Sequence, residues 1–276
     1  MENSKAKVNK EKSDININYL ISAIKNKMYL IISILSVILF FVMWEVASIY
    51  EWINPLFISS PTAIITSFFD MIYEPEFWDN IKVSAYEFGS GFLLALIIGI
   101  PLGILSGWNK LVYAIVNPFV SGLYVTPKVT LLPVFIIAFG IGPASKIAIV
   151  FLMSLFPIVM NAQRAMYTLD QNLIKTAYSF TATQLQMFRT VAIPSTIPFL
   201  LTGIRLGIGQ GLIAVVVGEL FAASAGIGFQ LTNDGQNLQT DRMFVGVLII
   251  TISGILLTTL LGLIEKRFSS WRPDNN

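Results

Sequence analysis

Several stretches of this chain are apolar for long enough to cross a lipid bilayer, and this feature constrains the fold more than any other. A helix needs about 20 consecutive apolar residues to span the hydrocarbon core. Inside that core every backbone N–H and C=O must be paired within the protein, so spanning segments are helices or strands of a closed barrel. The runs here are continuously apolar instead of alternating, which indicates helices. With a mean hydropathy of +0.72, the sequence predicts an all-α, polytopic membrane protein.

We expect about six transmembrane helices. The predicted spans are residues 29–50, 86–107, 112–139, 146–164, 197–220 and 243–264. The third span is interrupted by prolines, which lack a backbone donor and break helices. Residues 51–85 form a predicted external loop that contains a short interfacial helix. Ser60 suits the N-cap of that helix, and Pro61 suits its first position.

The positions of lysine and arginine orient these spans. The Lys-rich tail 1–28, the polar insert 165–196 and the tail 265–276 are basic, whereas 51–85 is acidic. Cytoplasmic loops of membrane proteins are enriched in Lys and Arg. Six spans place all three basic segments on the cytoplasmic side, so we expect both termini in the cytoplasm. Residues 86–264 then form one core domain that includes the insert.

The residue types exclude several kinds of chemistry. The chain has neither Cys nor His, which removes disulfides, thiol chemistry and histidine-based catalysis or metal ligation. It carries no G-x-x-x-x-G-K-[ST] motif and no G-x-G-x-x-G motif that follows a strand and opens a helix. We therefore expect a non-catalytic chain with no cofactor or metal ion of its own and no nucleic-acid partner.

The polar insert is patterned as two amphipathic helices. Its apolar stripe, with members three or four residues apart, consists of Ile174, Ala177, Thr181, Leu185, Phe188 and Val191. Asp170 is expected to cap the first helix. On pattern alone, such a helix–turn–helix hairpin either rests on the membrane surface or docks on a partner.

Two candidate N-caps mark the turn of this hairpin. Thr181 with Gln184 has the spacing of a capping box, and so does Thr183 with Gln186. We therefore expect a break near residues 181–183 and a second helix that ends before Pro194.

Residues 174–198 resemble the EAA motif of ABC-importer permeases; they read IKTAYSFTATQLQMFRTVAIPSTIP. The motif consists of Glu-Ala-Ala, three residues, Gly, nine residues and Ile-x-Leu-Pro. The matching positions hold Lys175, Thr176, Ala177, Thr181, Val191, Ile193 and Pro194. The resemblance implies that these residues belong to a coupling hairpin that docks on an ATPase subunit.

The resemblance extends over most of residues 40–272. It includes the segments ISSPTAI, TPKVTLLPVFIIAFGIGPASKIAI, LTGIRLGIGQGLIAVVVGELFAASAGIGF and EKRFSSWRP. Together they resemble the nitrate/sulfonate/taurine-type branch of binding-protein-dependent permeases. This implies a type I ABC-importer permease fold in a bacterial cell membrane. The implied partners are two copies of an ATPase subunit that holds the ATP, an extracytoplasmic substrate-binding protein and a second permease copy.

Two positions depart from the motif. Lys175 replaces an acidic residue and reverses a charge at the docking surface. Thr181 replaces the glycine, which would be costly if the turn needs a positive φ. A role for Thr181 as an N-cap would require only an ordinary φ. We therefore expect a slightly different turn, and an acidic residue on the ATPase opposite Lys175.

Four ionisable side chains stand out in the predicted spans, where such residues are functional candidates by default. Lys128, which follows Pro127 in the interrupted span, either attracts an anionic substrate or pairs with a carboxylate or a helix end. Glu219 either pairs with a cation, shapes an external gate or is a plain interfacial carboxylate. Arg205 and Glu45 are expected to be structural.

The chain is thus predicted to form the translocation path of an ATP-driven importer for a small solute. A sulfonate, taurine or nitrate is the first expectation, and a vitamin or pyrimidine precursor is the alternative. A stand-alone secondary transporter would need its own coupling-ion site. A membrane enzyme would need a constellation of acid, base or metal ligands. The sequence shows neither clearly.

Overall fold

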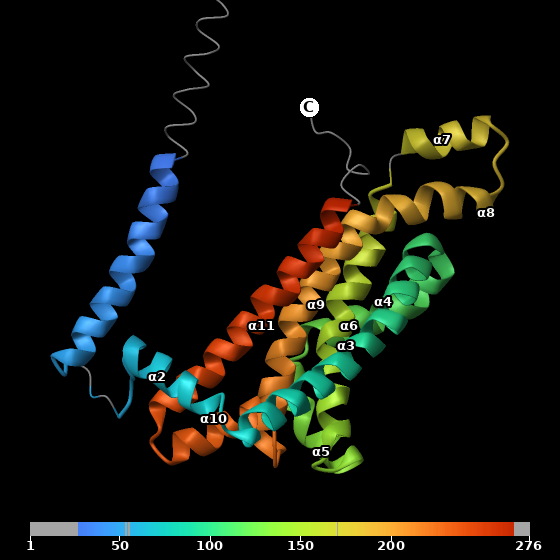
Figure 1. Cartoon of the computed structure of the whole chain (residues 1–276). Helices are drawn as coiled ribbons and strands as arrows, with labels where there is room; N and C mark the ends of the chain where they lie inside the picture. Colours follow the sequence, from blue (N-terminus) through green and yellow to red (C-terminus); the bar gives the residue numbers. More distant parts are fainter. Residues whose placement is uncertain (1–26, 53, 55, 170, 268–276) are drawn as a thin grey trace, which may run out of the picture. The chain divides into compact units, whose positions relative to one another are not determined.

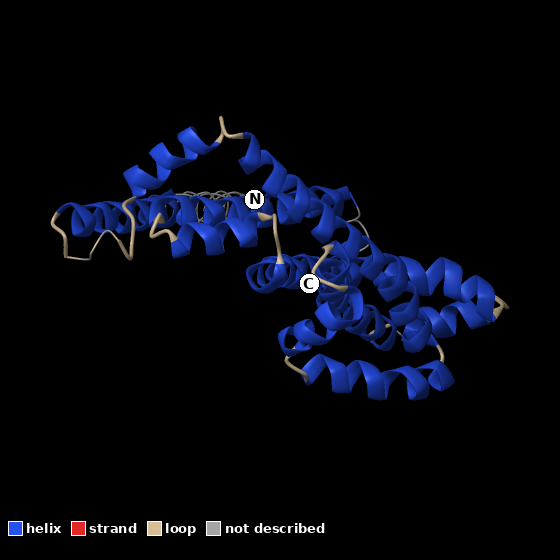
Figure 2. Cartoon of the chain, turned by 90° about the horizontal axis from the view of Figure 1, so that it is seen from below, coloured by secondary structure: helices blue, strands red, loops and turns tan. Residues whose placement is uncertain are grey.

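The computed structural model describes residues 27–267 apart from 53, 55 and 170, and every regular element in this part of the chain is a helix (Figure 2). Asp170, nearly all of the predicted N-terminal tail and most of the C-terminal tail lie outside the described residues. The chain divides into two compact units, residues 1–65 and 66–276.

The first unit contains an apolar helix, Lys27–Ile49, whose most apolar stretch has no buried side chain. The start of α2 (Pro61–Met71) is fixed by two caps. The Ser60 hydroxyl accepts a hydrogen bond from Ala63 N–H at 3.1 Å, which confirms the predicted N-cap. The Glu45 carboxylate accepts bonds from the Thr62 hydroxyl at 2.6 Å and from its N–H at 3.1 Å. Glu45 is therefore structural, as expected.

The second unit is a bundle around α6 (Pro143–Tyr167), which packs against α3 (Pro75–Trp108) and α9 (Ile193–Ala222). Figure 1 shows these helices running side by side, with α11 (Thr240–Arg267) along α9. The buried stripe of α3 is dominated by small residues and includes Ser84, Glu87, Gly91, Ala95, Gly99 and Gly103. A Cβ on Gly91 would lie 2.6 Å from the Ile147 carbonyl oxygen, so the glycine permits the close helix approach that is common in membranes.

One helix runs across the boundary between the predicted loop 51–85 and the predicted span 86–107. Helix α3 begins at Pro75 and continues without interruption to Trp108. Pro75 fits the first helical turn, where a missing N–H costs nothing, and nothing afterwards stops the helix before it reaches the apolar stretch. At about 1.5 Å per residue the helix is roughly 51 Å long, longer than the ~30 Å hydrocarbon core. Its polar first turns therefore project beyond the hydrocarbon.

The interrupted third span is sharply bent. Helix α4 (Lys110–Val125) is followed by a short 3-10 turn, η1 (Lys128–Leu131), and by α5 (Leu132–Phe139). The two halves meet at 96°, at the break before Pro127, which cannot supply a helical donor. In the described part of the chain, five helices are long and apolar enough to span a membrane, or six if this bent pair counts as one.

A short helix, α10 (Ile227–Gln236), connects α9 to α11. Beyond the end of α10, the guanidinium of Arg242 on α11 donates to both carboxylate oxygens of Glu74, at 2.8 and 2.5 Å. The Nε atom of Arg242 lies 3.7 Å from Asp234 Oδ1. The hydrogen bond from Arg242 lowers the pKa of Glu74 below its ordinary value. Burial raises the pKa of Asp234, although the Arg242 charge opposes this. These contacts join the start of α3 to α10 and α11.

Candidate functional site

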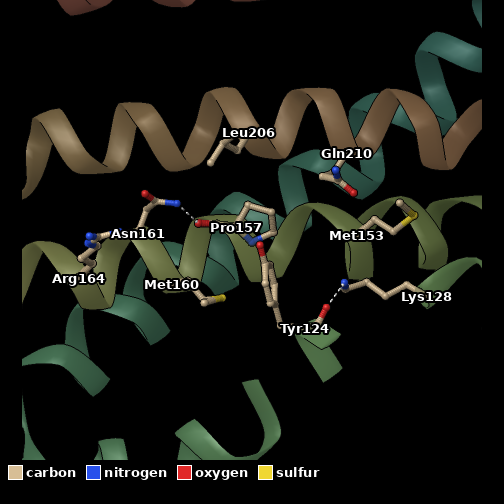
Figure 3. A pocket seen from close by; sticks show the side chains of 9 residues that line it. All are labelled: Tyr124, Lys128, Met153, Pro157, Met160, Asn161, Arg164, Leu206 and Gln210. Atoms are coloured by element: carbon tan, nitrogen blue, oxygen red, sulfur yellow. Dashed lines mark hydrogen bonds between the residues drawn. The ribbon is translucent and has the colours of Figure 1, made fainter. Parts of the chain in front are cut away.

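A cavity of about 550 Å³ opens between α4, η1, α6 and α9 (Figure 3). Sites for small molecules in proteins have volumes of roughly 300–1,000 Å³. The cavity is lined by Tyr124, Lys128, Met153, Pro157, Met160, Asn161, Arg164, Leu206 and Gln210. Tyr124 comes from α4 and Lys128 from η1, whereas the last two come from α9 and the others from α6.

The lining is cationic and rich in hydrogen-bonding groups. Among the described residues around the cavity there are two cations, Lys128 and Arg164, and no carboxylate. In Figure 3 they lie at opposite ends of the cavity, with Lys128 near Met153. From Met153 to Arg164 the α6 helix makes about three turns, or roughly 16 Å. Such a surface suits an anion, which would exchange part of its hydration for these donors.

Lys128 is held at the C-terminal end of α4. Its ammonium donates to the Tyr124 carbonyl at 2.9 Å and lies 5.1 Å from the Tyr124 ring centre and 5.4 Å from that of Phe156. The last carbonyls of a helix have no helical partner and carry partial negative charge. Pairing with a helix end, one of the alternatives left open for Lys128, is therefore present. An ammonium has three donors, and within the described residues Lys128 uses one, so the same side chain can also serve a solute.

Of the other two predicted path residues, neither lines this cavity. Pro127 shapes the bend, and its carbonyl accepts from the Thr130 N–H at 3.0 Å. Glu219 lies in the last turns of α9 and is 1% exposed. Its two carboxylate oxygens accept from the Ser84 hydroxyl and from Gly228 N–H, each at 2.6 Å.

Several lining residues were not singled out from the sequence. Asn161 and Arg164 are one turn apart on α6, and Gln210 interrupts an apolar stretch of α9. The Asn161 amide is oriented by a hydrogen bond to the Pro157 carbonyl at 2.8 Å. Arg164 is the last residue of the predicted span 146–164. A polar residue inside a predicted span is the signal that could have identified Asn161 and Gln210.

The second candidate site is the hairpin, defined as residues 171–192. Helix α7 (Gln171–Ser179) is followed by a turn, by α8 (Gln184–Met187) and by a π-helical turn, η2 (Phe188–Ala192). Figure 1 shows the hairpin at the end of the bundle opposite α5 and α10. The predicted break at 181–183 is confirmed.

The conformation expected at Thr181 is wrong. Thr181 has a φ of +58°, in the left-handed region that glycine favours. Its N–H donates to the Tyr178 carbonyl at 2.9 Å, and Ala182 N–H donates to the Ala177 carbonyl at 3.1 Å. This pair of bonds is the Schellman arrangement, in which the residue after the helix cap is usually glycine. Thr181 thus keeps the backbone that a glycine would adopt. The second candidate N-cap, Thr183, is confirmed by a complete capping box.

The predicted apolar stripe does not continue through the turn. Ile174 and Phe188 pack against a buried cluster of Ile104, Ala162, Met166, Leu169 and Ala192. Leu185, by contrast, is 58% exposed. The left-handed turn ends one helix and starts another, so the helical period is not carried from α7 into α8. The large apolar side chains left exposed on the hairpin are Leu173, Tyr178, Phe180 and Leu185.

Apart from Thr181 in the turn, the residues that match the EAA motif fall into two groups. Lys175 and Thr176 are exposed on α7, and Ala177 is half-buried beside the turn. The remaining three positions, Val191, Ile193 and Pro194, are half-buried where the hairpin joins α9.

The expectation that the second helix ends before Pro194 is wrong. The chain is helical from Gln184 to Ala222. Ile193 N–H donates to the Phe188 carbonyl in the π-helical turn. A turn of this type shifts the register by one residue, and Pro194 then falls in the first turn of α9, where its missing N–H is tolerated. The second arm of the hairpin and the spanning helix therefore form one continuous helix.

Comparisons of this chain with known protein families, sequences and structures all identify membrane transport proteins as similar. Residues 99–270 match the family model described as binding-protein-dependent transport system inner membrane component. The taurine transport system permease protein of Escherichia coli is 30% identical over 242 residues, which cover 86% of this chain and 88% of that protein. A putative aliphatic sulfonates transport permease protein of Bacillus subtilis is 29% identical over 229 residues, 83% of each chain. A chain in an inward-facing structure of the MetNI methionine ABC transporter has a TM-score of 0.61 at 19% identity, covering 72% of this chain and 99% of that one.

Proposed function

This chain belongs to the family of binding-protein-dependent transport system inner membrane components, and from this premise we propose its substrate, its partners and its orientation. As a member of that family it is the multi-pass permease subunit of an ABC importer. The family is non-catalytic, so the energy for transport must be supplied by another subunit.

The transported solute is a small oxoanion such as a sulfonate, taurine or nitrate. The observation that carries this proposal is the cavity with Lys128 and Arg164 at its two ends. The similarity to permeases named for taurine and aliphatic sulfonates supports it. A neutral pyrimidine precursor would gain little from two cations, so the cavity does not favour that alternative.

A second copy of this permease completes the translocation path. The cavity is polar, yet it lies among helices that are apolar enough to span a membrane. Ionisable and polar side chains at that depth face protein or a water-filled space, because lipid cannot pair them. A second copy, related by a two-fold axis, would supply the opposing wall and a second set of cations.

Two ATPase subunits dock on the hairpins and hold the ATP. The hairpin exposes four large apolar side chains, Leu173, Tyr178, Phe180 and Leu185, and a group of exposed apolar side chains among polar residues is typical of a protein interface. The hairpin and both chain termini then lie in the cytoplasm. The external binding protein delivers the solute at the opposite end, near α5 and α10. Because α8 is continuous with α9, ATP-driven movement of a hairpin tilts a helix that lines the cavity.

Co-purification tests this proposal. The tagged permease is expressed with its genomically adjacent ATPase, and ATP hydrolysis is measured with the binding protein and with taurine, an alkanesulfonate, nitrate or a pyrimidine. A stable complex stimulated by one of the anions is the expected result. A permease that purifies alone and transports without ATP would exclude the importer assignment, and stimulation by the pyrimidine alone would exclude the anion.

A further inference from the structure

Three ionisable side chains are buried together at the end of the bundle remote from the hairpin. Glu87 on α3 is 2% exposed, Glu219 on α9 is 1% exposed and Lys146 on α6 is 2% exposed. None of them lines the cationic cavity, and the proposed transport cycle gives none of them a role. Buried charges are costly unless they are paired, so the charge state of this cluster requires an explanation.

The hydrogen bonds identify Glu219 as the ionised carboxyl group. Both of its oxygens accept from donors, one from the Ser84 hydroxyl and the other from Gly228 N–H. An ionised carboxylate is an acceptor only and is stabilised by such donors. The Lys146 ammonium donates to the carbonyls of Ile141 and Gly142 at the start of α6, and it supplies the compensating positive charge for the cluster.

Glu87 is the candidate for the protonated group. Its carboxyl group belongs to the same buried cluster as that of Glu219, and two buried carboxyl groups beside a single lysine can share a hydrogen bond only if one of them is protonated. The Oε2 atom of Glu87 is buried and has no hydrogen-bond partner in the described part of the chain. One Lys and one ionised Glu then balance, whereas a second ionised Glu would leave a buried excess negative charge.

Glu219 of this cluster and two polar side chains of α3 hold the first turn of α10. Gly226 N–H donates to Asn80 Oδ1 and Ile227 N–H to the Ser84 hydroxyl, both at 2.8 Å. Gly228 N–H donates to Glu219. The first N–H groups of a helix have no partner within that helix, and here side chains of α3 and α9 satisfy three of them in succession.

We propose that Glu87 and Glu219 form a binding site for a single proton, and that this proton keeps the first turn of α10 docked on α3 and α9. Loss of the proton places two negative charges beside one lysine. Their repulsion displaces the Glu219 carboxylate from Gly228 and releases α10. The proposal does not depend on the identity of the transported solute or on the partner subunits.

Few other charged groups could control this site. Within the described residues, α3 contributes Glu87, α6 contributes Lys146, α9 contributes Glu219, and α10 contributes backbone N–H groups. Asp79 and Lys82 on α3 are exposed and pair with each other at 2.9 Å. Asp234, at the other end of α10, lies near Arg242. The proton balance therefore involves Glu87, Glu219 and Lys146.

Infrared difference spectroscopy of the permease in lipid nanodiscs tests the proton directly. At neutral pH the wild type should show the carbonyl stretch of a buried protonated carboxylic acid, and this band should vanish in Glu87→Gln. It should also vanish in Glu219→Gln, although Glu87 is retained, because Glu87 then becomes the carboxylate that balances Lys146. A band that persists in Glu219→Gln, or the absence of any such band in the wild type, overturns the shared proton.

Hydrogen exchange tests the effect on α10. Protection of the amides of residues 226–228, corrected for intrinsic exchange, should fall at alkaline pH with the slope of one proton, about tenfold per pH unit. In Glu87→Gln, which imitates the protonated acid, protection should stay constant over the same range. The exposed Glu76→Gln is the matched control and should titrate like the wild type. An identical pH dependence in Glu87→Gln and in the wild type overturns the proposed lock.

Discussion

Thr183 and Gln186 cap each other across the first turn of α8. Thr183 N–H donates to Gln186 Oε1 at 2.9 Å, and Gln186 N–H donates to Thr183 Oγ1 at 3.3 Å. This reciprocal pair fixes where α8 begins, and the chain must therefore leave α7 within the few residues before it. Thr181 is the residue that reverses the chain direction, and it does so in a left-handed conformation.

Replacing Thr181 by glycine should stabilise the hairpin. A left-handed conformation costs a residue with a Cβ about 1–2 kcal/mol, and glycine adopts it without that penalty. The free energy of local opening, measured by hydrogen exchange at the Ala182 amide that bonds to Ala177, should therefore rise. Ser179→Gly is the control, because glycine inside α7 should lower it. Faster exchange at Ala182 in Thr181→Gly would contradict the turn geometry.

Phe180 should be needed for docking of the ATPase. It is 80% exposed at the turn of the hairpin, so removing its ring should leave the permease folded while weakening the complex. Phe180→Ala should reduce co-purification of the ATPase and ATP hydrolysis by the complex. Phe221→Ala is the matched control, because Phe221 is 73% exposed near the opposite end of α9. Equal effects of the two substitutions would show that the hairpin tip is not the docking surface.

Lys175 should interact with an acidic residue on the ATPase. It is exposed on α7, at a position where the EAA motif has an acidic residue. Lys175→Glu should weaken assembly, and exchange of the partner's acidic residue for lysine should restore it. Restoration should weaken at high salt, because exposed ion pairs are screened. If no charge exchange on the partner alters the effect of Lys175→Glu, the reversed charge has no complementary group.

The Glu74–Arg242 pair should make the stability of the fold depend on pH in the acidic range. The pKa of Glu74 is lowered in the folded state by Arg242, so its contribution is present above the unfolded pKa and is lost as the pH falls through the folded pKa. The pKa of Asp234 is raised by burial, so its contribution runs the other way and is lost as the pH rises through the folded pKa. When the thermal unfolding temperature is measured from acidic to neutral pH, its fall on the acid side should be smaller in Glu74→Gln than in the wild type. In Asp234→Asn, the decline in stability that Asp234 causes as the pH rises should disappear instead. Identical pH profiles of stability for the two variants would contradict these assignments.

Sequence reasoning located the apolar spans and the hairpin because both depend on local patterns. Hydropathy locates spanning helices, and the spacing of Thr183 and Gln186 is sufficient to predict a cap. The features that sequence reasoning missed depend on more than the local pattern. Pro75 suits the first turn of a helix, but nothing local indicates that this helix continues unbroken into the apolar span, because its amphipathic start and its apolar continuation differ in composition. Likewise, whether Pro194 ends a helix depends on the π-helical turn before it.

The candidate sites were predicted only in part, because some of their residues stand out locally and others come together only through tertiary packing. Lys128 stands out because a lysine between prolines is unusual in a span, and it does line the cavity. Glu87 and Lys146 were missed because each lies near a predicted span boundary, where a charge is unremarkable. Their burial arises from the close contact of three helices. Asn161 and Gln210 become cavity residues only when α6 and α9 are placed side by side.

ATP-driven uptake by the reconstituted complex tests the central claim most directly. Uptake of a labelled sulfonate, taurine or nitrate should require ATP and the binding protein, and Lys128→Gln and Arg164→Gln should each reduce it about tenfold or more, because a charge-assisted hydrogen bond contributes about 1.5–3 kcal/mol. Lys110→Gln, an exposed lysine at the start of α4, should leave uptake unchanged. Undiminished anion uptake in the Lys128→Gln, Arg164→Gln double variant would show that this cavity is not the path.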